Sequence, residues 1–239
     1  MMLIAIFGFI FKIDIVVCNV LKGIDMINKN THRVYCSGPL FSPEENAAMA
    51  LIADTLENEG FSTFLPQRDG LEKYVLGSIN SSYMSNPLIK KMSIPINKAI
   101  FALDIYQIIE KCDCFVFNMN GRVPDEGGVV ETAVAFTSGK PLIIYKNDYR
   151  SLFNGNDNSM LTGLSYTFST VNQIKDIPDA LCQSIQYIES LDPSPYHGEH
   201  MPAYVKKIVN QGRQIWQIME TIPSHMDILF EQIQSIFQN

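Results

Sequence analysis

The residues best suited to covalent chemistry lie in the segment NGRVPDEGGVVE, residues 120–131. Asp125 opens the run DEGG, and Glu131 follows it by six residues. A helix is expected from about Val129 to Ser138, which places Glu131 in or near its first turn. The positive end of a helix favours an ionised carboxylate, and a carboxylate nucleophile must be ionised. A solvated glutamate at a helix start is the alternative interpretation of the same pattern.

Asp104 is the second candidate for chemistry. It lies at four-residue spacing from Ile100 and Ile108, on a helix that the pattern predicts from about Ile96 to Lys111. An acid within an apolar stripe is costly, and loss of solvent raises its pKa, so Asp104 would suit a proton donor. The alternative is that Asp104 lies at the edge of the stripe and reaches water or a backbone amide.

The elements that must position these residues alternate between two patterns from residue 33 onward. Short β-branched or aromatic runs alternate with segments of helical periodicity, which is typical of βαβ units and a parallel sheet. We therefore expect an α/β fold with an open parallel sheet, flanking helices and a C-terminal helical appendage. The strands are expected at residues 33–37, 61–65, 114–119 and 141–146, with a fifth near 164–168.

The first predicted helix has the clearest boundaries. Ser42 can cap it, Pro43 suits its first position, and Glu45 can return a bond to the cap. Gly60 supplies a left-handed exit. The buried stripe is expected to contain Ala48, Ile52 and Leu56.

The remaining segments are less regular. Residues 66–95 hold Pro, Gly, Ser and Asn without a clear period, which predicts a long loop with one short helix. A later helix aligns Leu181, Ile185 and Ile188, and two helical patterns follow a Pro/His linker. The second-last pattern places Ile208, Ile215, Trp216 and Met219 at helical spacing, and we expect them to be buried against the main domain or a partner.

Composition excludes several classes of partner. Charged residues make up 18% of the 239-residue chain and the formal net charge is -7, so no basic surface is available for nucleic-acid polymers or anionic membranes. The five cysteines have irregular spacing and no CxxC, which argues against a disulfide framework or a zinc cage and favours the cytoplasm. His197 and His200 lie in the Pro-flanked linker without further ligands at suitable spacing, so we expect no metal.

The apolar opening MMLIAIFGFIF does not have the features of a signal peptide. It lacks a basic residue before its apolar run, and Lys12 and Asp14 interrupt it. It is also shorter than the ~20 apolar residues that span a membrane as a helix. We expect residues 1–30 to be an extension outside the core, with Met26 as an alternative start, residues 31–192 to form the α/β domain and residues 193–239 a helical segment.

Ligands of open parallel sheets bind outside the carboxyl ends of the strands. Three polar loops follow predicted strands here: SGPLFS after the first, PQRDGLE after the second and NGRVPDEGGVVE after the third. These loops should therefore meet at one edge of the sheet, together with Glu131.

Taken together in chain order, these motifs resemble the nucleoside 2-deoxyribosyltransferase family over roughly Val34 to Leu164. The resemblance implies a flavodoxin-like sheet, no cofactor and no metal. It also implies that Glu131 is the nucleophile, that Asp104 and Asp125 contact the base and the deoxyribose, and that one of these two aspartates protonates the departing base. The substrate-binding residues that it implies are Tyr35, Gly38, Phe41, Gln67, Arg68, Asp69, Asn158 and Met160.

The activity implied by this resemblance is transfer of a 2-deoxyribosyl group between nucleobases by double displacement. The partners are then a deoxynucleoside and a free nucleobase. The loop with Asn158 and Met160 resembles one that completes a neighbouring subunit's site, which implies a homo-oligomer with shared sites.

Two alternatives remain open from the sequence. One is an N-glycosidase acting on 2'-deoxynucleosides or their 5'-monophosphates, in which Ser37, Ser42 and Arg68 hold the phosphate and water replaces the second base. The other is a non-catalytic nucleotide-binding module, although SGP is neither GxGxxG nor a P-loop.

Overall fold

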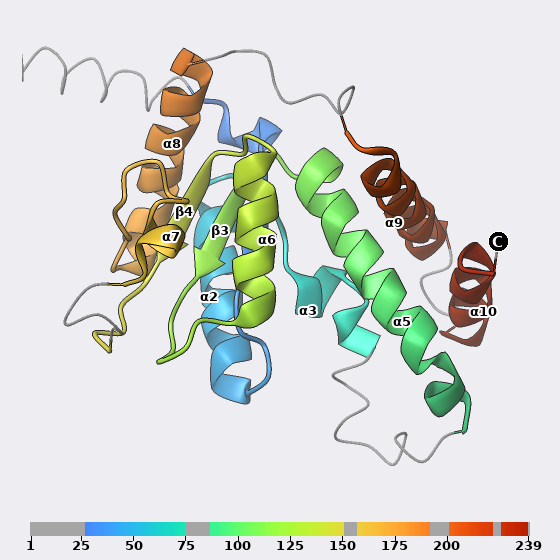
Figure 1. Ribbon diagram of the computed structural model, residues 1–239. Helices are drawn as coiled ribbons and strands as arrows, with labels where there is room; N and C mark the ends of the chain where they lie inside the picture. Colours follow the sequence, from blue (N-terminus) through green and yellow to red (C-terminus); the bar gives the residue numbers. More distant parts are fainter. Residues whose placement is uncertain (1–26, 75–86, 151–156, 192–200, 222–225, 239) are drawn as a thin grey trace, which may run out of the picture.

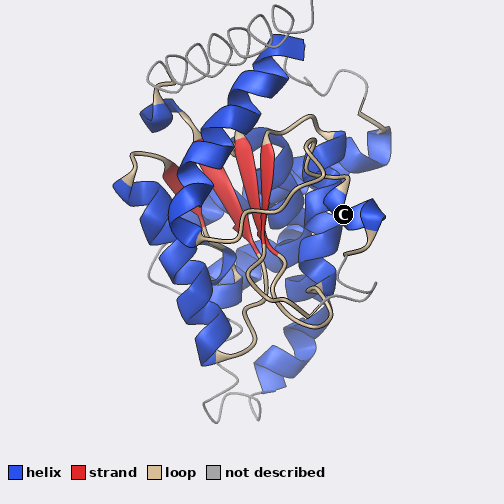
Figure 2. Ribbon diagram, turned by 90° about the vertical axis from the view of Figure 1, so that its left-hand side faces the viewer, coloured by secondary structure: helices blue, strands red, loops and turns tan. Residues whose placement is uncertain are grey.

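The centre of the molecule is a parallel sheet of four strands, seen in a computed structural model that describes residues 27–74, 87–150, 157–191, 201–221 and 226–238. The strand order β2-β1-β3-β4 is the flavodoxin-like order, and helices lie on both faces (Figures 1 and 2). This confirms the predicted α/β class. The strands are β1 (Arg33–Ser37), β2 (Ser62–Phe64), β3 (Cys114–Asn118) and β4 (Leu142–Tyr145).

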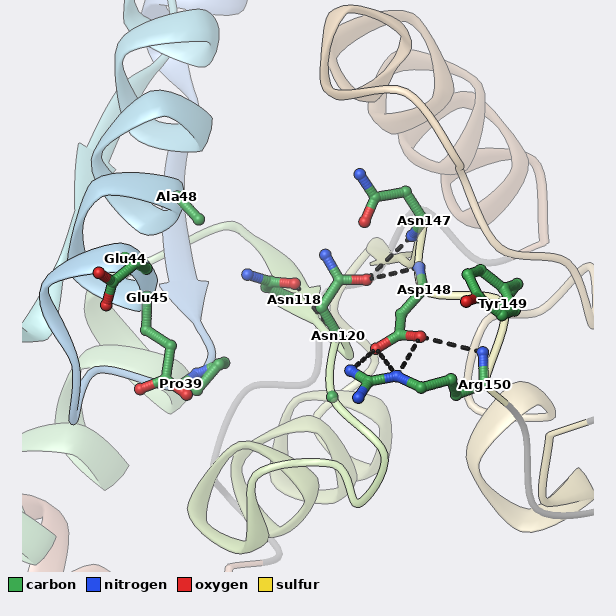
Figure 3. A pocket seen from close by; sticks show the side chains of 11 residues that line it. Pro39, Glu44, Glu45, Ala48, Asn118, Asn120, Asn147, Asp148, Tyr149 and Arg150 are labelled. Atoms are coloured by element: carbon green, nitrogen blue, oxygen red, sulfur yellow. Dashed lines mark hydrogen bonds and ion pairs between the residues drawn. The ribbon is translucent and has the colours of Figure 1, made fainter.

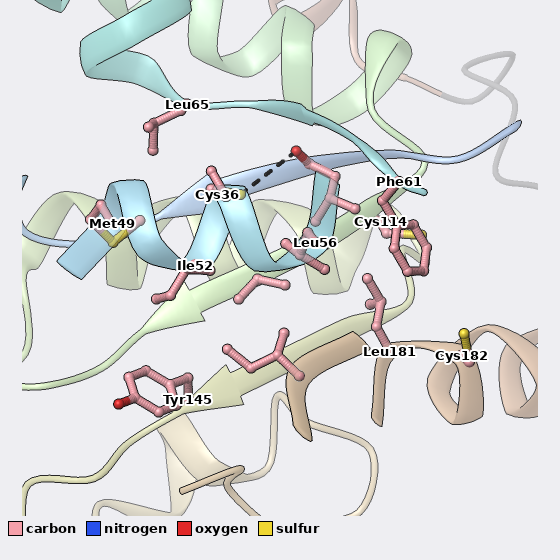
Figure 4. Packing of buried hydrophobic residues seen from close by; sticks show 14 of the residues in the cluster. Cys36, Met49, Ile52, Leu56, Phe61, Leu65, Cys114, Tyr145, Leu181 and Cys182 are labelled. Atoms are coloured by element: carbon pink, nitrogen blue, oxygen red, sulfur yellow. Dashed lines mark hydrogen bonds between the residues drawn. The ribbon is translucent and has the colours of Figure 1, made fainter. Parts of the chain in front are cut away.

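Two sets of helices cover the sheet. On one face, α2 (Pro43–Asn58) packs against β1 and α8 (Ile177–Leu191) against β4, in a core cluster that includes Val34 and Cys36 (Figure 4). On the other face, α6 (Glu126–Thr137) packs against Tyr35 and the aromatic side chains of β3. Successive side chains of a strand point to opposite faces, so Tyr35 and Ser37 both lie on the α6 side. The short helices are η1 (Lys29–Thr31), α3 (Pro66–Asp69), α7 (Ser159–Thr162) and η4 (Ile174–Asp176).

Helix α2 begins as predicted. The Ser42 hydroxyl accepts from the Glu45 amide, and the Glu45 carboxylate accepts from the Ser42 amide, which completes a capping box. Gly60 ends the segment with φ +96°. Ile52 and Leu56 are buried as predicted, whereas Ala48 is only half-buried because the buried stripe passes through Met49 instead.

The start of α6 differs from the prediction. Asp125 is its N-cap and accepts a 2.6 Å hydrogen bond from the Gly128 amide, so the helix begins at Glu126 rather than near Val129. Glu131 therefore lies in the second turn. A helix dipole acts mainly within the first turn, so it is not what holds the Glu131 carboxylate.

Helix α5 also begins earlier than predicted. It covers Pro87–Tyr106, with Pro95 inside it, and a π-helical turn follows at Gln107–Lys111. An interior proline removes one hydrogen bond but does not always end a helix, which is why the expected loop was too long. The predicted short helix in that region is confirmed by α3.

The predicted fifth strand is wrong. Residues 164–168 form hydrogen-bonded turns after α7, and the Leu164 and Ser165 amides bond back to the carbonyls of Leu161 and Thr162. Beyond β4, Val171 makes only an isolated bridge with Tyr145. Local turn bonds have taken the place of a strand ladder.

The C-terminal helices α9 (Ala203–Thr221) and α10 (Met226–Ile236) pack beside α5 (Figure 1). Gly212 permits the close approach, since a Cβ at this position would come within 2.0 Å of the Ala102 carbonyl oxygen. Ile215 and Met219 are buried and Trp216 is partly buried, which confirms the predicted packing of this segment.

The described part of the chain contains no helix long and apolar enough to cross a membrane. Its cysteines, Cys36, Cys112, Cys114 and Cys182, are buried free thiols. The His197–His200 segment lies outside the described residues.

Candidate active site

A partly buried carboxylate held by two hydroxyl groups forms the centre of the candidate site. The Tyr35 hydroxyl donates to Glu131 Oε1 at 2.9 Å, and the Ser37 hydroxyl donates to Oε2 at 2.5 Å. Tyr35 and Ser37 come from the same face of β1, and Glu131 faces them from α6. Both carboxylate oxygens are thus fixed in position by one strand.

The Gly-Gly pair allows α6 to approach the sheet closely. A Cβ on Gly128 would lie 2.4 Å from the Phe117 ring and 3.1 Å from Ser37 Oγ. One helical turn later, Glu131 reaches the hydroxyl groups of β1 for the same reason. The glycine is therefore part of what positions the carboxylate.

Two further acids lie beside Tyr35. Asp104 on α5 and Glu72, after α3, are each only 8% exposed. The Asp104 carboxyl group interacts electrostatically with the Tyr35 hydroxyl group and with the Glu72 carboxyl group. The sequence singled out Asp104 correctly as an acid in an apolar stripe, but it singled out Glu72 only as part of the loop PQRDGLE. A carboxylate at the end of a polar loop gave no sign of burial.

Burial controls the protonation of these groups. It raises the pKa of Glu131 to about 7, although the Ser37 and Tyr35 hydroxyl groups act in the opposite direction. Burial raises the pKa of Asp104 well above its usual value, and the negative charges of Glu72 and Glu131 add to this effect. Near neutral pH the site therefore offers an ionisable Glu131 beside an acid that holds its proton, which is the pairing of a nucleophile with a proton donor.

The remaining aspartate and the first loop are close to this centre. Asp125 caps α6 and its charge raises the pKa of Glu131. Gly38 is in tight contact, because a Cβ there would come within 2.7 Å of Met49 Sδ. Phe41 is 76% exposed and is free to contact a ligand.

The second loop divides into two parts. The Gln67 amide is shielded from solvent and has no hydrogen-bond partner among the described residues, so its donor and acceptor are available. Arg68 is instead paired with Glu57 at 2.9 Å and with Asp69 at 3.0 Å. Asp69 also accepts from the Leu65 amide. Arg68 and Asp69 thus stabilise the loop itself.

Asn158 and Met160 are not brought to Glu131 within one chain. Asn158 caps α7 by accepting from the Met160 amide at 2.9 Å, and both residues are exposed. Met160 is 77% exposed. An exposed methionine and a polar cap at the carboxyl edge of the sheet remain available to another molecule.

A groove of about 560 Å³ opens on the α2 side of the same sheet edge (Figure 3). The Asn120 side chain organises one wall by accepting from the amides of Asn147 and Asp148. Asp148 in turn pairs with Arg150. The groove is lined by Pro39, Glu44, Glu45, Ala48, Asn118, Asn120, Gly121, Asn147, Asp148, Tyr149 and Arg150.

Among the residues that the structure describes, no group of three or more His, Cys, Asp or Glu side chains is arranged to hold a metal ion. The charges of Glu72, Asp104 and Glu131 all act on Tyr35, and the charges of Glu72 and Glu131 both raise the pKa of Asp104.

Comparison with known proteins gives one family. Residues 34–186 match the family model described as nucleoside 2-deoxyribosyltransferase. No curated protein matches the chain. The chain is similar to a crystal structure of a conserved protein from Enterococcus faecalis V583, with 18% sequence identity and a TM-score of 0.43, over 64% of this chain and 98% of that chain. The family match includes both β1 and α6, which carry Tyr35 and Glu131.

Proposed function

Because the chain belongs to the nucleoside 2-deoxyribosyltransferase family, we propose that it breaks the N-glycosidic bond of a 2'-deoxynucleoside and passes the deoxyribosyl group to a second base. The observation that carries this proposal is the Glu131 carboxylate, which is fixed through both oxygens by Tyr35 and Ser37. A fixed, partly desolvated carboxylate is suited to attack at an anomeric carbon.

In the first half of the reaction, a Glu131 oxygen forms a bond to C1' and the bond from C1' to the base nitrogen breaks. The electron pair of that bond stays with the base, which takes a proton from the buried acid at Asp104. The product is a deoxyribosyl ester of Glu131 and a free neutral base. Tyr35 and Ser37 keep the carboxylate oriented during this step.

In the second half, another base enters the vacated position and its ring nitrogen attacks C1'. The ester bond breaks, Glu131 regains its charge and the proton of the incoming base returns to the acid. Two inversions retain the β-anomer, as in retaining glycosidases. Asp125 lies six residues before Glu131, at the cap of the same helix, where we place it beside the sugar.

The geometry gives less support to a hydrolase that holds a 5'-phosphate. Ser42 is used in the capping box of α2, and Arg68 is used in ion pairs with Glu57 and Asp69. Ser37 donates to Glu131. In the described structure each of these three groups already takes part in an interaction within the chain.

Sharing of the site between subunits is part of the proposal. The exposure of Asn158 and Met160 supports it, since neither residue is used within its own chain beyond the α7 cap. In a homo-oligomer these side chains would complete the pocket of a neighbouring Glu131.

The proposal is tested by incubating the protein with deoxyinosine or thymidine, with and without adenine or cytosine, and separating the products by chromatography. A new deoxynucleoside supports transfer, whereas free deoxyribose alone indicates a hydrolase. Glu131→Gln should abolish both by several orders of magnitude while the protein stays folded. Glu126→Gln is the matched control, because this exposed acid lies on the same helix and should leave the rate unchanged.

A further inference from the structure

Glu72 is a buried acid to which the proposed reaction assigns no role. It opens a helical turn at residues 72–74, and its Oε2 atom has neither solvent contact nor a hydrogen-bond partner among the described residues. A buried carboxyl oxygen without a partner destabilises a protein. A function in the site would explain why an acid occupies this position.

The loop before Glu72 closes on its carboxyl group from one side. A Cβ on Gly70 would come within 2.3 Å of Glu72 Oε2, so the loop backbone lies directly against it. The Glu72 carboxyl group also interacts with that of Asp104, whose Oδ1 atom is likewise shielded from solvent without a hydrogen-bond partner among the described residues. Asp104 in turn meets Tyr35, which donates to Glu131. Acids from three separate elements thus act electrostatically on one tyrosine hydroxyl group.

No ion pair among the described residues neutralises these three acids. Two arginines of neighbouring helices are used elsewhere: Arg68 of α3 pairs with Glu57 and Asp69, and Arg213 of α9 pairs with Glu110. Adjacent buried carboxyl groups cannot all ionise near neutral pH, and their protons belong to the group as a whole. Burial raises the pKa of Glu72 as well as that of Asp104.

We propose that Glu72 and Asp104 act as one acid, in which the two carboxyl groups share a proton and deliver it to the departing base. This inference rests on the proposed function. It assigns to Glu72 a positioning role, because Glu72 acts on the base through the proton that it shares with Asp104.

The charges of the step balance. As the Glu131 oxygen bonds to C1', the electron pair of the glycosidic bond moves to the base nitrogen, and the shared proton follows to that nitrogen. Glu131 loses its negative charge in the ester, and the Glu72–Asp104 pair gains one. Loss of the Glu131 charge removes a repulsion that kept the proton on the pair, so the pair becomes a stronger acid when the proton is needed. The second half-reaction reverses each change.

The groups that face Asp104 predict how the pH profile should move. They are Tyr35 from β1, Glu131 from α6 and Glu72 from the turn after α3. In Glu72→Gln, Asp104 loses a neighbouring negative charge, so its pKa should decrease. The alkaline limb of the pH–rate profile should therefore move to lower pH by at least about one unit. The acid limb should move down as well, because the Glu72 charge also raises the pKa of Glu131.

The test compares two substrates across the pH range. An N7-methylated purine 2'-deoxynucleoside releases a neutral base without protonation, whereas deoxyadenosine requires a proton. With deoxyadenosine at pH 8, Glu72→Gln should lose at least about tenfold in kcat/KM, within the ~10²–10⁴-fold that acid catalysis contributes. With the methylated substrate it should keep its rate within about threefold, by the same reasoning.

Controls separate this role from a structural one. Glu72→Asp, which keeps the carboxyl group, should recover part of the rate and the profile, and Glu126→Gln should leave both unchanged. If circular dichroism shows that Glu72→Gln does not fold, Glu72→Met takes its place, because methionine has a similar volume and carries no charge. An unshifted profile, or equal losses on both substrates, would overturn the acid pair. If the wild-type protein cleaves neither substrate, the proposed function fails and the acid pair fails with it.

Discussion

Glu131 occupies a position where burial opposes its charge and two hydroxyl groups support it. The Glu131 carboxyl group is a good nucleophile only when it is ionised, and burial raises its pKa to about 7. The raised value means that the nucleophile is lost as the pH falls through about 7. Tyr35 and Ser37 act against this, since each donates a hydrogen bond to the charged form.

Removing the Tyr35 hydroxyl should therefore move the acid limb of the pH–rate profile. In Tyr35→Phe the protonated form of Glu131 is favoured, so its pKa should increase. We expect the acid limb to move to higher pH by about one unit, which corresponds to the free energy of one hydrogen bond to a charged group. Measuring kcat/KM from pH 5 to 9 checks this. A limb that stays in place, with a folded variant, would show that the hydroxyl does not control the carboxylate.

At the same scale, the sequence pointed to Asp104 because an acid in an apolar stripe conflicts with the local pattern. It pointed to Glu131 because this residue was expected near the start of the helix that follows DEGG. Glu72 could not be identified in this way. Its burial depends on how the PQRDG loop closes against α5, and that contact joins segments distant in the chain. From the sequence Arg68 was expected to bind a ligand, because its ion pairs with Glu57 and Asp69 become visible only in the folded structure.

Helix α6 positions the nucleophile through its close approach to β1 and β3. Its start at Glu126 depends on the Asp125 cap, which a sequence pattern locates only to within a few residues. The capping box of α2 was predictable because it is entirely local. Pro95 and the turns near Leu164 were misjudged because tertiary packing and local turn bonds outweighed simple propensity.

Gly128→Ala tests the role of this close approach. The added methyl group would meet the Phe117 ring of β3 at 2.4 Å, so either this ring or α6 must shift. We expect a loss of roughly 1–3 kcal/mol in the free energy of unfolding and a large loss of activity, although alanine ordinarily favours a helix over glycine. Gly127→Ala is the matched control, since the nearest atom there is at 3.3 Å. Equal behaviour of the two variants in urea melts and rate assays would contradict this role.

At the scale of the whole molecule, the parallel sheet was predictable because each strand is short, apolar and followed by a polar loop. The crossing of α9 over α5 was not, because it depends on Gly212 meeting the Ala102 backbone. The division of the chain near residue 192 stays a prediction. So does assembly into an oligomer, which depends on the exposed residues Asn158 and Met160.

Shared sites predict complementation between inactive variants. Mixed oligomers of Glu131→Ala and Asn158→Ala contain some sites with both intact residues, so part of the activity should return after subunit exchange. Rate assays on the mixture, with exchange verified by a mass-tagged subunit, provide the measurement. Full activity in a protein that is monomeric at micromolar concentration would rule out shared sites, and so would mixtures that stay inactive despite exchange.

The central claim is that Glu131 forms a covalent bond to the sugar, and the most direct measurement is the mass of the quenched protein. The protein is mixed with a deoxynucleoside in the absence of an acceptor base, quenched in acid within one turnover and digested for peptide mapping. We predict a deoxyribosyl adduct on the peptide that carries Glu131, absent from Glu131→Gln and removed when an acceptor base is added before quenching. Turnover by the wild-type protein without an adduct on Glu131, together with more than about a tenth of the rate in Glu131→Gln, would contradict the account.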